Sequence, residues 1–216
     1  MARLKVAVLV SGRGSNMQAI LDATNDPDYP AEIALVVSNI EGAAALDRAR
    51  DANIKTVTIA HKDFPDRESF DREVTREIKE AGCKLVVLAG FMRLLSEEFC
   101  NTWRDQLINI HPSLLPSFKG LDVHQRMIDA GVRFGGCTVH YVRHEMDTGP
   151  IIAQAAVPVH PGDNADMLAA RILEQEHKIY PLAVKWIAED RVRISGEVTR
   201  VSGAVPADGT MINFQS

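Results

Sequence analysis

Residues 5–16 read KVAVLVSGRGSN, and this stretch decides the fold. The run from Val6 to Val10 is continuously apolar, which is typical of a strand buried on both faces of a parallel sheet. A loop containing Gly12 and Gly14 follows at once, and an amphipathic segment starts at about Ser15. A buried strand, a glycine loop and a helix in direct succession predict the start of a βαβ unit.

The same alternation continues outward from this first unit. Short β-branched runs predict further strands at residues 33–38, 56–59, 85–88 and 107–110. Longer amphipathic stretches predict helices at residues 15–25, 43–52, 66–81 and 96–103. Strands and helices that alternate in this way predict a parallel sheet with helices packed on its faces.

The second half of the chain has a different pattern. The strand candidates Gly136–Val142 and Ile151–Val159 are separated only by a loop around Asp147, which favours antiparallel pairing. We therefore predict an α/β fold with a Rossmann-like, doubly wound, mostly parallel sheet and an antiparallel edge in the C-terminal half.

A long helix is expected to follow from about residue 164 to residue 188. Asp163 is the predicted N-cap, and Pro181 is expected to kink or break the helix. The tail from Val192 onward has room for one more strand. Its last dozen residues are rich in Gly, Pro, Thr and Ser and support no assignment.

Length and composition are those of an ordinary globular domain. With 216 residues the chain is long enough to bury one substantial core, so we expect a single domain. Hydrophobic residues make up 46% and charged residues 25%, which argues against disorder, a collagen-like repeat or a coiled coil. The formal net charge of −5 provides no broad positive field, so duplex nucleic acid is not expected as a partner.

Cysteine usage and the N-terminal residues predict a cytoplasmic protein. Cys83, Cys100 and Cys137 are odd in number and widely spaced, so neither a disulfide framework nor a zinc site is expected. The first residues lead straight into a strand candidate without the features of a signal peptide. No apolar run is long enough to span a bilayer, so no membrane partner is expected.

The glycine loop at residues 12–16 suits a phosphate group. Glycines let a ligand approach the backbone closely, and a helix N-terminus presents unpaired N–H groups. A dinucleotide fingerprint needs a third glycine where Met17 stands, although Glu41 lies where a ribose-binding acid would follow the second strand. A P-loop lysine is also missing, so we favour a phosphomonoester over NAD or ATP, with a simple tight turn as the alternative.

An amide, an imidazole and a carboxylate stand where strands give way to loops. His111 precedes Pro112, so it should end the fifth strand and project from the carboxyl edge of the sheet, where ligands bind. Asn109 lies two residues earlier on the same face, which would bring its amide beside the imidazole. Asp147 would favour the charged imidazole, and the two donors would stabilise an oxyanion. Together they indicate an acyl-transfer site, although each alone also fits an ordinary structural role.

Several motifs occur in the order seen in glycinamide ribonucleotide formyltransferases, and the chain resembles that family over nearly its whole length. They are GRGSN at 12–16, LAGFMRLL at 88–95, NIHPSLLP at 109–116, DTGPI at 147–151 and QEH at 175–177. The resemblance implies transfer of a formyl group from 10-formyltetrahydrofolate to the amine of 5'-phosphoribosylglycinamide in purine biosynthesis. It also implies one formyltransferase domain over 1–216, with a phosphate-binding half at 1–110, a folate-binding and catalytic half at 111–190, and a tail from about 191.

The same resemblance implies a role for each residue of the site. His111, as imidazolium, would stabilise the oxyanion and move protons, and Asn109 would be a second donor. Asp147 would keep the imidazole charged and help a water molecule to shuttle protons. Contacts with the ribonucleotide are implied for Gly14, Ser15 and Asn16 at the phosphate and for Glu176 at the ribose.

Folate binding is also implied, with the loop at 142–147 closing over the pterin and reading it through backbone groups. The folate-binding residues implied are Arg67, Met92, Arg93, Leu94, Leu95, Asn109, Val142, Arg143, His144, Glu145, Met146 and Asp147. No metal is needed for this chemistry. Two positions depart from the family pattern: Arg13, which we expect to point to solvent, and Asp122, which stands where a histidine is more usual.

Alternative functions remain open at this point. A formyltetrahydrofolate deformylase and methionyl-tRNA formyltransferase use the same cofactor, but each needs an additional domain for which this chain has no room. A non-catalytic nucleotide-binding module is the alternative from another class. The pair Glu174 and His177 resembles half of a di-metal site without its second half, and His61, His140, His144 and His160 are assigned no chemistry. The sequence leaves monomer and homodimer equally open.

Overall fold

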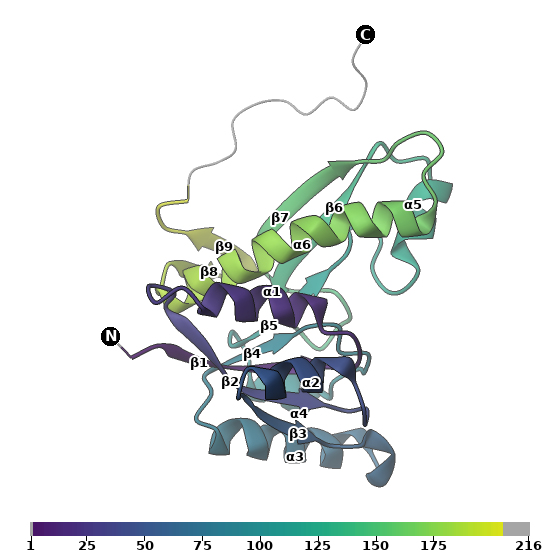
Figure 1. Ribbon diagram of the computed structural model, residues 1–216. Helices are drawn as coiled ribbons and strands as arrows, with labels where there is room; N and C mark the ends of the chain where they lie inside the picture. Colours follow the sequence, from purple (N-terminus) through teal and green to yellow (C-terminus); the bar gives the residue numbers. More distant parts are fainter. Residues whose placement is uncertain (1, 205–216) are drawn as a thin grey trace.

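The computed structural model describes residues 2–204, which contain one seven-stranded sheet, helices on both of its faces and a separate two-stranded hairpin (Figure 1). The strands of the large sheet are β1 (Leu4–Val10), β2 (Ala31–Ser38), β3 (Lys55–Thr58), β4 (Leu85–Leu88), β5 (Leu107–His111), β6 (Phe134–Tyr141) and β7 (Ile151–Pro158). The helices are α1 (Ser15–Thr24), α2 (Ala44–Asp51), α3 (Arg67–Glu80), α4 (Glu97–Thr102), α5 (Val123–Asp129) and α6 (Ala165–Ala188), with a 3-10 turn, η1 (His61–Asp63). The hairpin consists of β8 (Val192–Ser195) and β9 (Val198–Val201).

The order of the strands decides where a ligand can bind. It is β3-β2-β1-β4-β5-β6-β7, with parallel pairing from β3 to β5 and antiparallel pairing of β6 and β7. The predicted doubly wound sheet with an antiparallel C-terminal edge is therefore confirmed. The chain moves outward from β1 to β3 and then returns to place β4 on the other side of β1, so these two strands form a topological switch point.

Two hydrophobic cores lie on opposite faces of the sheet. Alternate residues of β1 enter different cores, because Val6 and Val8 face one while Ala7 and Leu9 face the other. The first core draws on α1, α2, α5 and α6, and the second on α3 and α4. Burial on both faces is the reason that β1 is apolar without alternation.

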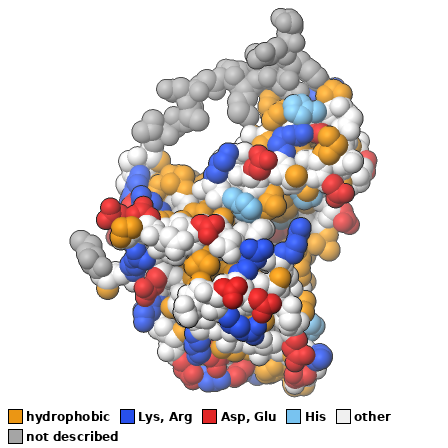
Figure 2. Space-filling view, viewed as in Figure 1, with side chains coloured by type: hydrophobic (Ala, Val, Ile, Leu, Met, Phe, Trp, Pro, Cys, Tyr) orange, Lys and Arg blue, Asp and Glu red, His pale blue; other side chains and the backbone are white. Residues whose placement is uncertain are grey.

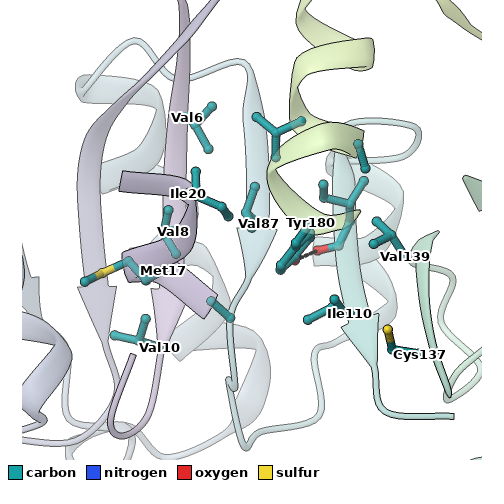
Figure 3. Packing of buried hydrophobic residues seen from close by; sticks show 14 of the residues in the cluster. Val6, Val8, Val10, Met17, Ile20, Val87, Ile110, Cys137, Val139 and Tyr180 are labelled. Atoms are coloured by element: carbon teal, nitrogen blue, oxygen red, sulfur yellow. Dashed lines mark hydrogen bonds between the residues drawn. The ribbon is translucent and has the colours of Figure 1, made fainter. Parts of the chain in front are cut away.

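A tyrosine connects the long helix α6 to the middle of the sheet (Figure 3). The side chain of Tyr180 is completely buried, and its hydroxyl donates to the backbone oxygen of Leu88 at 2.7 Å and lies 3.3 Å from that of Ile108. These oxygens belong to β4 and β5, the two strands that lead into the loops of the candidate site. One buried hydroxyl therefore fixes α6 over both strands.

The long helix differs from the sequence prediction in two respects. Its N-cap is Asn164, whose side chain accepts from the backbone N–H of Met167 at 2.9 Å. Asp163 was the wrong choice, because its carboxylate instead pairs with Arg171 at 2.7 Å. The helix also runs unbroken through Pro181, since burial of the flanking turns against the sheet offsets the lost backbone hydrogen bond.

The short turn η1, the helix α5 and the second strand of the tail were not predicted. The short helix α5 has no apolar periodicity long enough to identify it, and its N-cap residue, Asp122, is in a left-handed conformation. The tail forms two strands, β8 and β9, instead of one, because a tight turn at Gly196 reverses the chain. The last dozen residues, 205–216, lie outside the described part of the chain.

Replacing Tyr180 with Phe should lower the free energy of unfolding by about 1–2 kcal/mol, because the ring stays but the buried hydrogen bond is lost. Urea denaturation measures this change. Tyr141→Phe is the matched control, since Tyr141 is also buried but its hydroxyl makes no hydrogen bond to any described residue. An equal loss in both variants would contradict the role given to the Tyr180 hydroxyl.

Candidate active site

The loops that follow β1 and β4 meet at the switch point of the sheet. Ser11 joins them, because its hydroxyl accepts from the backbone N–H of Met92 at 2.8 Å and donates to Asn39 at 2.6 Å. The glycine loop and the segment 92–95, both predicted from sequence to bind substrate, are thereby held against each other. This is the place where open α/β sheets bind their ligands.

The glycine loop leads directly into α1. Gly14 has φ +73°, and a Cβ added there would lie 2.5 Å from that of Ala45, so the position requires glycine. No side chain caps the first turn of α1, which starts with Ser15 and Asn16. The backbone N–H groups of that turn are therefore available to an anion. Arg13 is exposed, in agreement with the expectation that it points to solvent.

Two residues expected to bind the ribonucleotide touch each other. The amide nitrogen of Asn16 donates to the carboxylate of Glu176, on α6, at 2.7 Å. Glu176 is 6% exposed, and burial raises the pKa of its carboxyl, with the Asn16 hydrogen bond acting in the opposite direction. The amide oxygen of Asn16 is buried and has no partner among the described residues, so it can accept from a ligand hydroxyl.

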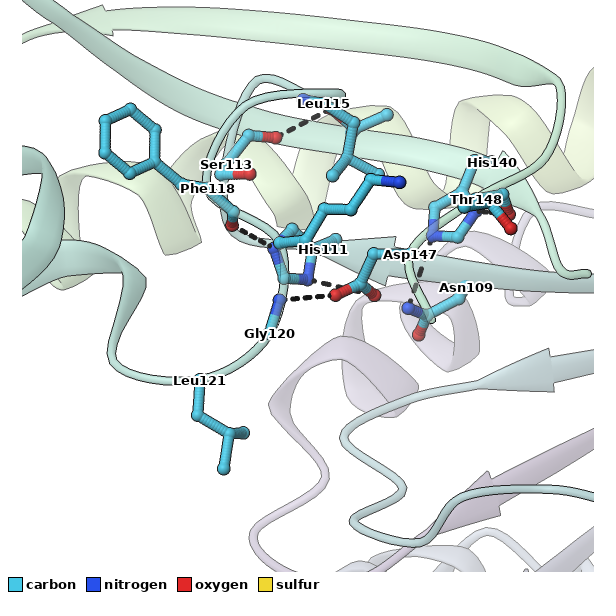
Figure 4. A network of polar contacts seen from close by, with 12 residues as sticks. Asn109, His111, Ser113, Leu115, Phe118, Gly120, Leu121, His140, Asp147 and Thr148 are labelled. Carbon is cyan, nitrogen blue, oxygen red and sulfur yellow. Dashed lines mark hydrogen bonds and ion pairs between the residues drawn. The ribbon is translucent and has the colours of Figure 1, made fainter. Parts of the chain in front are cut away.

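His111 and Asp147 lie together at the carboxyl edge of the sheet (Figure 4). The side chain of His111 is 7% exposed, and its Nδ1 lies 3.4 Å from a carboxylate oxygen of Asp147. Its Nε2 lies 2.9 Å from the backbone oxygen of Phe118, and the second Asp147 oxygen accepts from Gly120 N–H at 2.7 Å. Both ring nitrogens face acceptors, an arrangement that an imidazolium satisfies completely.

Asn109 is placed differently from the expectation. Its amide nitrogen lies 3.4 Å from Nε2 of His140, its partner in the antiparallel β5–β6 register, and not against the imidazole of His111. The cause is that β6 brings a second buried histidine to the same face of the sheet, where it receives the amide. The two predicted donors are therefore both at this edge but are held by separate partners (Figure 4).

His140 is the site residue that the sequence analysis missed. It is 1% exposed, and its Nδ1 faces the backbone oxygens of Tyr141 at 2.9 Å and Thr148 at 3.2 Å. Burial lowers its pKa, and oxygens that only accept place the proton on Nδ1, which leaves Nε2 to accept from Asn109. The pairing of β5 with β6 would have identified His140 as a neighbour of Asn109, but the register of these two strands cannot be read from the sequence.

The residues expected to bind folate divide into exposed and buried groups. Met92 and Leu94 are 72% and 52% exposed, whereas Leu95 is packed in the core beneath them. The guanidinium of Arg93 lies 4.7 Å above the ring of Phe70. Arg67 is exposed at the first position of α3.

The folate loop, defined here as residues 142–148, carries a further exposed apolar side chain, Met146. Asp147 itself has φ +50°, a conformation that aspartate tolerates. Asp122, the second departure from the expected pattern, is also left-handed and offers no side-chain cap to α5.

Charge and metal-binding groups limit the kinds of site that the described residues can form. Figure 2 shows acidic and basic side chains intermixed over the visible face, without a broad basic patch. Within residues 2–204 no three His, Cys, Asp or Glu side chains are grouped so that they could hold a metal ion. In the same range, no helix is both long enough and apolar enough to cross a membrane.

Comparison with known proteins relates this geometry to a family. The model of the family described as formyl transferase matches residues 4–184. The chain belongs to the formyl transferase family. Within this family it is 43% identical to phosphoribosylglycinamide formyltransferase of Escherichia coli strain K12, over 93% of this chain and 94% of that protein. Glycinamide ribonucleotide transformylase 1 from Symbiobacterium toebii superposes with a TM-score of 0.90 at 41% identity, covering 92% of this chain and 94% of that chain.

Some relatives of this chain are much longer. The trifunctional purine biosynthetic protein adenosine-3 of Drosophila pseudoobscura pseudoobscura is 50% identical over 92% of this chain. The chain spans 15% of the length of that protein.

Glu176→Gln should stabilise the protein increasingly as pH rises. Because burial raises the folded-state pKa above the ordinary value of 4.5, the stability contributed by the carboxyl is full below that value and is lost as pH rises through the folded-state pKa. Glutamine keeps an acceptor for Asn16 and carries no charge. Urea denaturation of both proteins from about pH 4 to pH 7 should show the difference emerging with pH. The exposed Glu174→Gln, on the same helix, is the control, and a matching trend there would refute burial as the cause.

Proposed function

We propose that this chain transfers a formyl group from 10-formyltetrahydrofolate to the amine of 5'-phosphoribosylglycinamide, giving phosphoribosyl-N-formylglycinamide and tetrahydrofolate in purine biosynthesis. The observation that carries the proposal is the buried His111–Asp147 pair, at the same edge of the sheet as the glycine loop. Similarity to phosphoribosylglycinamide formyltransferase of E. coli over nearly the full length supports the same activity. In this proposal residues 1–216 act as one domain, whose first half binds the phosphate.

The ribonucleotide would enter at the switch point. Its phosphate would accept from the backbone of Gly14, Ser15 and Asn16, where the uncapped helix terminus favours an anion. Its ribose hydroxyls would reach Glu176 and the unpaired amide oxygen of Asn16. This orientation directs the glycinamide amine towards His111.

In the reaction a nucleophile attacks the formyl group, an oxyanion forms and two protons are transferred. The amine attacks the formyl carbon, a C–N bond forms, and the carbonyl oxygen becomes an oxyanion. Asn109, held at one amide hydrogen by His140, and the His111 imidazolium donate to that oxygen. The separation of 3.4 Å between Nδ1 of His111 and the carboxylate of Asp147 is longer than a strong charge-assisted hydrogen bond. Nδ1 can therefore exchange Asp147 for another acceptor.

Collapse of the intermediate completes the transfer. The bond from the formyl carbon to N10 of the folate breaks, N10 gains a proton, and the attacking nitrogen loses one. Asp147 would accept the proton of the amine through a water molecule and keep the imidazole charged. Folate would lie along Met92–Leu95 and under the folate loop, with Arg67 as a further contact.

The remaining properties follow the same proposal. The proposed reaction needs no metal, and the only ligands proposed are the ribonucleotide and the folate. We propose a cytoplasmic location, with a monomer or a homodimer as the working form.

The deciding experiment mixes the purified protein with 10-formyltetrahydrofolate and follows tetrahydrofolate with and without 5'-phosphoribosylglycinamide. The proposal expects product only when the ribonucleotide is present. Formate and tetrahydrofolate released without an acceptor would identify a deformylase. Binding of both ligands without turnover would make the chain a binding module and overturn the catalytic proposal.

His111→Ala should reduce kcat by at least about a hundredfold, because both oxyanion stabilisation and proton transfer are lost. Calorimetry should show ribonucleotide binding nearly unchanged, since the phosphate loop is intact. His160→Ala, at an exposed loop histidine, is the control for removal of an imidazole. Weakened binding with unchanged kcat would instead make His111 a binding residue.

A further inference from the structure

The two ends of the folate loop are held by backbone hydrogen bonds, whereas its middle is exposed and lies next to a cleft. The backbone N–H of Val142 donates to Leu107 at 2.9 Å, and that of Tyr141 donates to Pro150 at 2.9 Å. Between these points, residues 144–146 are exposed. A cleft of about 470 Å³ lies next to the loop, lined by residues that include Asn101, Thr148 and Glu197. Packing on an apolar core therefore does not hold the middle of the loop.

A charged side chain of the folate loop lies beside this cleft, where apolar packing is missing. Arg143 is the second residue of the folate loop, and its side chain is only 12% exposed. Its guanidinium lies 2.9 Å from the carboxylate of Asp105 and 3.1 Å from that of Glu197. Glu197 also pairs with Arg104 at 3.2 Å. Three segments far apart in sequence are thus joined at one guanidinium.

The stem of Arg143 also touches the other end of the loop. Gly149 has φ +112°, and a Cβ added there would lie 3.1 Å from Cγ of Arg143 and 2.1 Å from the backbone oxygen of Tyr141. The arginine stem therefore crosses directly over the residue that follows the folate loop. A side chain that closes the base of the loop in this way restricts the position of Asp147 between its ends.

The hairpin that carries Glu197 is itself fixed to the sheet. The hydroxyl of Thr199, on β9, donates to the backbone oxygen of Ile151 at the start of β7. Arg191, just before β8, lies 5.9 Å from the ring of Trp186 on α6. Glu197 lies next to Gly196 in the turn of this hairpin, so the segment that carries its side chain to Arg143 is fixed at both ends.

We propose that Glu197 and Asp105, acting through Arg143, are positioning residues that hold the folate loop in the conformation in which Asp147 reaches His111. The inference rests on the proposed function, because it assigns the β8–β9 hairpin a part in folate binding. We call the two ion pairs of Arg143, with Asp105 and Glu197, the tether. The carboxylates of Asp105 and Glu197 are about half exposed, at 44% and 56%, so salt should weaken the tether.

The test compares Glu197→Gln with Asp190→Asn. Asp190 precedes the same hairpin and forms an exposed ion pair with Arg193 that does not touch the folate loop. Hydrogen exchange of the backbone amides of residues 143–148, measured without ligands, should become faster in Glu197→Gln alone. The KM for 10-formyltetrahydrofolate should rise about two- to fivefold, as expected for losing a half-exposed ion pair, with the KM for the ribonucleotide unchanged. High salt should raise the folate KM of the parent protein towards that of the variant.

A second substitution separates positioning from general stability. In an Arg143→Gln background, Glu197→Gln should add nothing to either readout, because the path through the guanidinium is already cut. Arg143→Lys should give an intermediate result, since lysine keeps the charge but not the fork. Unchanged exchange in Glu197→Gln, or exchange that rises equally throughout the protein, would overturn the tether. Because hydrogen exchange is measured without substrates, it tests the tether even if the parent protein transfers no formyl group.

Discussion

The parallel pairing of β1 with both β2 and β4 is the constraint on which the rest of the structure depends. A strand with neighbours on both edges and helices on both faces loses all contact with water, so its five residues from Val6 to Val10 must be apolar. Because β2 and β4 pair with opposite edges of β1, the order in which successive strands join the sheet reverses at β1. The loops after β1 and β4 lead to helices on opposite faces, and they meet at the switch point, where open α/β sheets bind their ligands.

The proposed function uses polar groups whose burial does not favour stability. Glu176 is kept in a position where burial raises its pKa, and the amide oxygen of Asn16 beside it has no partner in the described chain. Arranging such groups costs folding free energy. At His111 the opposite holds, because Phe118 and Asp147 supply an acceptor for each ring nitrogen and so favour one orientation of the ring.

Much of the fold was predictable because its signals are local. Strand β4 begins and ends at the predicted residues, and β5 and α1 differ from prediction by one residue at an end. His111 and Asp147 were expected to meet, and they do. Three of the misses involve contacts that local sequence patterns do not reveal. Asn109 turns to His140 because of the β5–β6 register, Asp163 pairs with Arg171 instead of capping α6, and the Pro181 turn is held by the sheet below it.

The sequence by itself determined the fold class, the family and the edge of the sheet at which the reactive groups gather. The fold class and this edge follow from apolar periodicity and glycine positions, which operate over a few neighbouring residues, whereas the family follows from a resemblance in motifs along nearly the whole chain. Only the tertiary structure decided that His140 receives the amide of Asn109 and that Arg143 joins the folate loop to Asp105 and Glu197. Such partners are chosen by strand register and by the path of the hairpin. Those depend on packing across the whole sheet, which no local stretch of sequence specifies.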